Sequence, residues 1–133
     1  IVILQAMKKE EIYCRSCYNH LAGKIGVKIT RALLENKLLE LDGNTFIVTK
    51  KGEQFSADAG INLNSLRRLR RPLTRACLDG SEKEYHLAGS LGDELMANFL
   101  SKNYLFLTPG SRAIGITAAG MQFFEKNLNI RGI

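Results

Sequence analysis

Three cysteines and two histidines are the residues of this chain whose type and spacing could support chemistry. Cys14, Cys17 and His20 are spaced Cys-x-x-Cys-x-x-His, and Cys77 precedes His86 by nine residues. Thiolate and imidazole are the ligands with which proteins hold zinc in tetrahedral Cys₂His₂ sites. If the fold brings the two segments together, four residues could bind zinc: Cys17, His20, Cys77 and His86.

Other interpretations of these residues stay open. A free cysteine often serves as a small buried hydrophobic side chain, and the Cys-x-x-Cys pair does not recur in the second segment. The two histidines could instead stack, hydrogen-bond to each other or line a small-molecule pocket. An odd number of cysteines without secretory features argues against a disulfide framework and predicts reduced thiols.

An arginine-rich segment carries much of the net charge of +6. Its cationic members are Arg67, Arg68, Arg70, Arg71 and Arg75. On a helix with leucines on its opposite side, these side chains would form a face suited to nucleic-acid phosphates. The alternative is a solvated linker whose arginines pair with local acids.

The glycine pairs Gly23/Gly26 and Gly89/Gly92 are predicted to be packing elements at which one helix crosses another. A dinucleotide-binding fingerprint is excluded, because no strand is expected before these glycines and the third glycine is missing. No Ser/His/Asp set, paired-carboxylate site or phosphate-binding loop is present in the sequence. We therefore expect a protein that is not an enzyme.

The elements that would position the cysteines and histidines occur twice. Residues 20–41 match residues 86–107 at an offset of 66, with eight of 22 positions identical. After a two-residue insertion, residues 48–55 match residues 116–123 at an offset of 68. Two half-domains of about 50 residues would leave apolar surface exposed if separate, so we expect them to share one core.

Each copy is predicted to contain a long helix, a β-hairpin and a second helix. Apolar residues recur at helical spacing over residues 17–39. Turns at residues 42–44 and 108–111 predict hairpins, and Thr49 and Thr117 are predicted N-caps. Ser81 and Glu84 form a capping-box pattern just before the second long helix. The expected fold is α+β and mostly helical, with two pseudo-symmetric, winged-helix-like repeats packed on each other.

We expect a single domain over residues 1–133. Repeat one is expected at about residues 13–63 and repeat two at about 77–130. Between them we expect a connecting basic helix at 64–76 with Asn64 as its cap. Apolar spacing at Ile1, Leu4, Met7 and Ile12 predicts a further helix that continues from sequence upstream, so we expect a C-terminal fragment. No apolar run is long enough for a membrane span and no signal peptide is recognisable, which predicts a cytoplasmic protein.

Five short motifs resemble those of a known family. They are CYNHLAGKIG at 17–26, LRRLRRP at 66–72, RACLD at 75–79, HLAGSLG at 86–92 and PGSRA at 109–113. Over about residues 13–125, the chain resembles the C-terminal region of a subgroup of ArsR-like helix-turn-helix transcriptional regulators. In that family a DNA-reading winged helix lies upstream of a duplicated region whose effector is generally undefined, so the resemblance implies regulation of transcription.

The resemblance extends to individual site residues. Four residues match the family pattern: Cys17, His20, Cys77 and His86. Cys14 lies outside that pattern, and Gly80 stands where the family usually has Trp, which puts an aromatic contact there in doubt. We expect an effector-sensing or dimerisation domain that forms a homodimer, reaches DNA through the full-length protein and responds to a small molecule or a metal. The alternatives are a metal- or redox-responsive module and a winged-helix pair that binds DNA directly.

Overall fold

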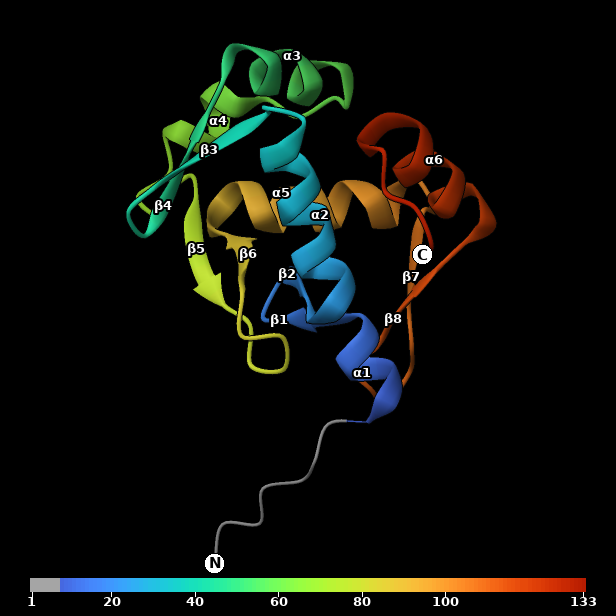
Figure 1. Ribbon diagram of the computed structural model, residues 1–133. Coiled ribbons are helices and arrows are strands. Elements are labelled where there is room, and N and C mark those ends of the chain that lie inside the picture. The colour runs from blue at the N-terminus through green and yellow to red at the C-terminus, as the bar shows by residue number, and fades with distance from the viewer. Residues whose placement is uncertain (1–7) are drawn as a thin grey trace, which may run out of the picture.

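The computed structural model describes residues 8–133, over which the chain forms six helices and eight strands (Figure 1). In chain order these are α1 (Lys9–Tyr13), β1 (Arg15–Cys17), β2 (His20–Ala22), α2 (Gly23–Glu35), β3 (Leu39–Asp42), β4 (Thr45–Val48), α3 (Lys50–Asp58), α4 (Leu63–Arg67), β5 (Arg75–Leu78), β6 (Tyr85–Ala88), α5 (Gly89–Ser101), β7 (Leu105–Leu107), β8 (Ile114–Ile116) and α6 (Ala118–Leu128). The prediction of a mixed α+β fold is confirmed. None of the helices in this described part combines the length and apolar character needed to cross a membrane.

The order hairpin, helix, hairpin, helix occurs twice, on either side of α4. The strands pair as four antiparallel hairpins, β1 with β2, β3 with β4, β5 with β6 and β7 with β8. Helix α5 begins and ends 66 residues after α2, and α6 begins 68 residues after α3. The two offsets in the sequence therefore correspond to the two offsets between elements.

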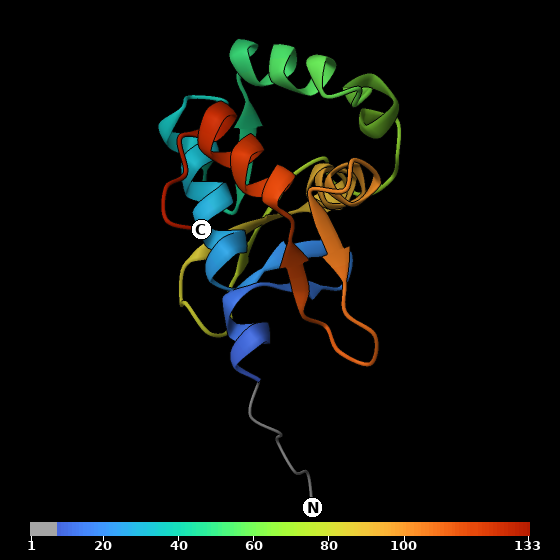
Figure 2. The same ribbon diagram turned by 90° about the vertical axis from the view of Figure 1, so that its right-hand side faces the viewer.

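Each half docks its first hairpin onto the other half. The backbone N–H of Ala76 in β5 donates to the carbonyl of Asn44 at 2.8 Å, and that of Ser16 in β1 donates to the carbonyl of Arg112 at 2.9 Å. Helix α2 packs on β6, and α5 packs on β2. In Figure 2 the β7–β8 hairpin accordingly lies beside β1 and β2. Neither half is complete without the other.

One hydrophobic core extends through both halves. Among its largest fully buried side chains are Ile25, Phe99, Leu105, Phe124 and Leu128. Phe99 of α5 meets Phe124 of α6 edge to face, with ring centroids 5.2 Å apart. The aromatic residues of the second half thus belong to the same core as Ile25 of α2 in the first half.

The predicted long helix over residues 17–39 is wrong at its start. Residues 15–22 form the β1–β2 hairpin, and the helix begins only at Gly23. The same error affects the second half, where Ser81 and Glu84 lie in the β5–β6 connection and α5 starts at Gly89. An apolar run of three or four residues fits a strand or a helix equally well, so periodicity alone could not separate them.

The predicted connecting helix at 64–76 is also too long. Helix α4 ends at Arg67, and its N-cap is Asn62 and not the predicted Asn64, because the Asn62 side chain accepts from the backbone N–H of Ser65. Arg75 belongs to β5 instead. Pro72 lacks a backbone N–H and disfavours helical backbone in Arg71, so a helix could not continue through it to residue 76. Of the predicted N-terminal helix, Ile12 lies in α1, while residues 1–7 are outside the described part.

The glycine pairs have a different role from the predicted helix crossing. Gly23 and Gly89 adopt φ of +76° and +83° at the turn from strand to helix. A Cβ on Gly26 would lie 2.7 Å from the Leu21 carbonyl oxygen, and Gly92 is equally close to its own preceding strand. The glycines therefore let each helix start directly against the strand before it. Since strands do precede these glycines, the exclusion of a dinucleotide fingerprint rests on the missing third glycine alone.

Two threonines cap equivalent helices, as predicted. The Thr49 hydroxyl accepts from the backbone N–H of Gly52 at 3.1 Å, and that of Thr117 accepts from Gly120 at 2.9 Å. Removing an N-cap side chain costs about 1 to 2 kcal/mol. We expect Thr49→Ala and Thr117→Ala each to lower the free energy of unfolding by that amount in urea denaturation. Thr108→Ala, at an exposed position, is the control and should change it by less than about 0.5 kcal/mol.

Candidate metal centre

The first hairpin of each half pairs one cysteine with one histidine. In β1–β2, Cys17 lies directly opposite His20, and in β5–β6, Cys77 lies directly opposite His86. Directly opposite residues in an antiparallel pair project from the same face of the hairpin. Each hairpin therefore presents one thiol and one imidazole together.

The two hairpins bring these faces against each other. The Nε2 atoms of His20 and His86 are 3.0 Å apart, and the ring centroids are 4.8 Å apart at an interplanar angle of 45°. The Sγ atoms of Cys17 and Cys77 complete a cluster in which all four candidate ligand atoms lie within 4.8 Å of one another. The structure thus brings together the four residues predicted as metal ligands, and it also shows the hydrogen bond between the histidines that was the alternative to a metal site.

A buried carboxylate orients His86. Asp79 is fully buried, and its Oδ1 is 3.0 Å from Nδ1 of His86. Burial alone would raise the pKa of Asp79, but backbone hydrogen bonds from Glu82 and Gly23 outweigh it and hold that pKa well below its usual range. The ionised carboxylate accepts from Nδ1–H of His86. The lone pair on Nε2 of His86 consequently points into the cluster and accepts from Nε2–H of His20.

Both imidazoles are neutral near pH 7. Burial, followed by the neighbouring His86, lowers the pKa of His20 to about 4. Burial also lowers the pKa of His86, although Asp79 opposes that shift. Burial and the adjacent Cys17 thiol raise the pKa of Cys77. A neutral imidazole is the form that binds metal, whereas the thiols must lose their protons to do so.

Asp79 is the central residue that the sequence analysis did not identify as functional. Its Oδ1 accepts from the backbone N–H of Gly23 at 2.7 Å and from Nη2 of Arg15 at 3.2 Å. Its Oδ2 accepts from Ser81 and Glu82 in the β5–β6 connection. Arg15 is itself 4% exposed. Asp79 is the last residue of the motif RACLD. A single acid at the end of an apolar segment was the signal from which its role could have been found.

A hollow of about 470 Å³ adjoins the cluster and is lined in part by His20, Cys77 and Asp93. Asp93 lies 3.8 Å from Nδ1 of His20 and 2.7 Å from Arg71. The hollow connects solvent to one edge of the buried cluster. It therefore provides a path by which an ion could reach the ligand atoms.

The arginine segment does not form the predicted continuous helical face. Arg67 pairs with Glu53 of α3, Arg71 pairs with Asp93 of α5, and Arg75 lies in β5. All five arginines of the segment are exposed. At least two of them are thus matched by acids, as in the linker alternative.

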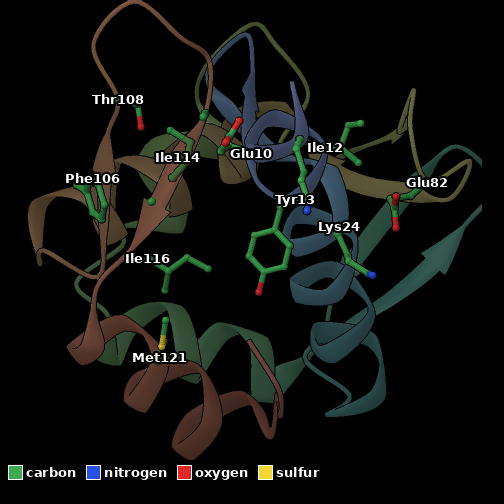
Figure 3. Close-up of a pocket in the computed structure, with 13 residues that line it drawn as sticks. Glu10, Ile12, Tyr13, Lys24, Glu82, Phe106, Thr108, Ile114, Ile116 and Met121 are labelled. Carbon is green, nitrogen blue, oxygen red and sulfur yellow. The ribbon is translucent and has the colours of Figure 1, made fainter. Parts of the chain in front are cut away.

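A second concave site is apolar and lies on another part of the surface. The pocket has a volume of about 650 Å³ between α1, the β7–β8 hairpin and α6. In Figure 3, Tyr13 projects between Ile116 and Lys24, and Met121 closes the side formed by α6. Pockets of this size with mostly apolar walls and a few polar groups are typical of small-molecule sites.

One relative of known name covers most of the chain. The chain is 40% identical over 124 residues to the uncharacterized HTH-type transcriptional regulator YdfF of Bacillus subtilis (strain 168). The match includes 93% of this chain but only 55% of that protein. The name describes a regulator and not an enzyme, in agreement with the expectation from the sequence. No protein-family profile matches the chain, and no solved structure matches it.

The three cysteines should differ sharply in reactivity. Cys14 is fully buried, and burial raises the pKa of its thiol to about 12. Cys17 and Cys77 are only partly buried. With chelator present, we expect an alkylating reagent to label Cys17 and Cys77 at least about 100-fold faster than Cys14, because the thiolate is the nucleophile. Mass spectrometry of peptides over time measures the three rates, and equal rates would contradict the burial of Cys14.

Proposed function

We propose that this chain is the C-terminal regulatory region of an ArsR-like winged helix-turn-helix transcriptional regulator. The observation that carries the proposal is the 40% identity to YdfF over 93% of the chain. The part of YdfF outside the match leaves room for a separate DNA-binding winged helix, which we place upstream of this region. Such a protein acts on DNA in the cytoplasm.

Within this region, we propose two pseudo-symmetric, winged-helix-like repeats at about residues 13–63 and 77–130. Support comes from the repeated element order and from the reciprocal hydrogen bonds between the halves. We assign DNA recognition to the upstream part and not to the repeats. Arg67 and Arg71 support this assignment, because acids of the same chain already pair with them.

The experiment uses the full-length protein with sheared DNA of its host. We expect it to enrich a small set of fragments, with an affinity that falls as salt rises. Arg68 and Arg70 form no ion pair among the described residues. Neutralising them should leave the selected fragments unchanged, and also the salt slope, that is, the rate at which the logarithm of the affinity falls with the logarithm of the salt concentration. A lower slope in that variant would favour direct DNA contact by this region, and no enrichment by the full-length protein would contradict regulation through DNA.

The apolar pocket supports effector sensing as the regulatory role. We further propose a homodimer as the working form. A panel of small apolar compounds, tested by thermal shift, should include some that raise the Tm. Met121→Arg, inside the pocket, should abolish the shift, whereas Leu107→Arg is the control at an exposed apolar position outside it. If the compounds still raise the Tm of Met121→Arg, this pocket is excluded as their binding site. Light scattering measures the oligomeric state.

A further inference from the structure

We infer that Cys17, His20, Cys77 and His86 form a tetrahedral site for a divalent cation, with zinc as the fitting ion. The inference does not depend on the proposed function, because it concerns metal content alone. Two thiolates and two imidazoles are a set that proteins use for structural zinc, and tetrahedral S₂N₂ coordination favours zinc among the common divalent ions.

The first support is distance. In an ideal tetrahedron with Zn–S near 2.3 Å and Zn–N near 2.0 to 2.1 Å, the ligand atoms are about 3.3 to 3.8 Å apart. The four atoms here already lie within 4.8 Å of one another. The histidine Nε2 atoms, at 3.0 Å, would separate by a few tenths of an ångström around an ion. Side-chain rotations that shorten the widest ligand-to-ligand distance by about 1 Å would complete the tetrahedral geometry.

The second support is the orientation of the rings. Metal-binding histidines usually donate their other ring N–H to a carboxylate, which fixes the tautomer. Nδ1 of His86 is hydrogen-bonded to the buried Asp79 at 3.0 Å, whereas Nδ1 of His20 is 3.8 Å from Asp93, beyond hydrogen-bond distance. The Nε2 atoms of the two rings, 3.0 Å apart, face the same space. Asp79 thus holds His86 in the tautomer and orientation that a metal-binding histidine has.

The third support is charge and proton balance. Binding releases one proton from each thiol, and the two thiolates neutralise the dipositive ion. The proton on Nε2 of His20 moves to Nδ1, where it faces Asp93, so the imidazoles release none. The bound site is then neutral, which suits a location in which His20 and His86 are 6% and 1% exposed.

The site would also join the two halves of the molecule. Cys17 and His20 come from the β1–β2 hairpin of the first half, and Cys77 and His86 come from the β5–β6 hairpin of the second. An ion bound by the folded chain and not by the unfolded chain stabilises the fold by mass action. Removal of the ion should therefore lower the Tm.

The test is metal analysis of the full chain purified under reducing conditions without added metal. We expect about one equivalent of zinc per chain, and a Tm lower by about 10 °C after chelation. Cys17→Ser and Cys77→Ser should each retain less than a tenth of an equivalent. Cys14→Ser is the matched control, since Cys14 lies outside the cluster, and should keep the full equivalent.

If the serine variants fail to fold, the inference is tested by titrating Co²⁺ into the wild-type chain after a chelator has removed its metal and has itself been removed. Tetrahedral thiolate coordination should produce intense visible ligand-field bands and a thiolate charge-transfer band, and Zn²⁺ should displace both. Less than a tenth of an equivalent of zinc, with unchanged melting after chelation, would overturn the site. So would a Co²⁺ spectrum without thiolate charge transfer, or a metal-free protein in which Cys17 and Cys77 form a disulfide.

Discussion

Asp79→Asn is expected to lower the free energy of unfolding by about 3 to 5 kcal/mol, the usual cost of breaking a buried ion pair by removing one partner. The two carboxylate oxygens each accept from three donors. Oδ1 accepts from Gly23, Arg15 and His86. Oδ2 accepts from the backbone N–H and hydroxyl of Ser81 and from the backbone N–H of Glu82.

An asparagine of the same shape cannot satisfy both sets. Either orientation of the amide turns an NH₂ group toward three donors, so buried polar groups lose their partners whichever way the side chain lies. The guanidinium of Arg15, which is 4% exposed, also loses its buried negative partner. The Oδ1 contacts are buried and those of Oδ2 are part-buried, so water can replace the lost partners only in part.

Urea denaturation followed by circular dichroism, with chelator present, measures the effect in a chain that contains no Trp. Asp93→Asn is the matched control. Asp93 is partly exposed and pairs with the half-exposed Arg71, so its replacement should cost less than about 1 kcal/mol. A cost below 1 kcal/mol for Asp79→Asn would show that the Asp79 network does not hold the two halves together.

Gly120→Ala is expected to lower the free energy of unfolding by about 3 kcal/mol or more, because overpacking against fixed backbone is destabilising. A Cβ at this position would lie 2.1 Å from the carbonyl oxygen of Tyr104. That oxygen already accepts from the backbone N–H of Thr117 at 3.0 Å, so the helix start cannot move away without losing this hydrogen bond. Helix propensity favours alanine by only about 1 kcal/mol and does not offset the clash.

The equivalent change in the first half provides an internal repeat of the experiment. A Cβ on Gly52 would also lie 2.1 Å from a carbonyl oxygen, that of Leu38, so Gly52→Ala should cost a similar amount. Gly80→Ala is the control, since the nearest atom would be 3.9 Å away, and should change stability by less than about 0.5 kcal/mol. Thermal melts of the three variants give the comparison, and a neutral Gly120→Ala would contradict the close contact between α6 and Tyr104, the residue before β7.

The sequence by itself determined the features whose signals are local. The turns at residues 42–44 and 108–111 do join the strands of hairpins, and Thr49 and Thr117 do cap helices. Each of these features depends on residues within a few positions of one another, so the residue types are sufficient. The offsets of 66 and 68 also predicted the spacing of the helices.

Only the tertiary structure decided how the first hairpins form and what surrounds the histidines. Strands of three or four residues have few contacts of their own, and the partners of Ser16 and Ala76 come from the opposite half of the chain. The spacing of Cys17 and His20 predicted candidate ligands, but the role of Asp79 depends on donors as distant in sequence as Gly23 and Arg15. Buried polar groups must find partners wherever the fold places them, and a linear pattern does not contain that information.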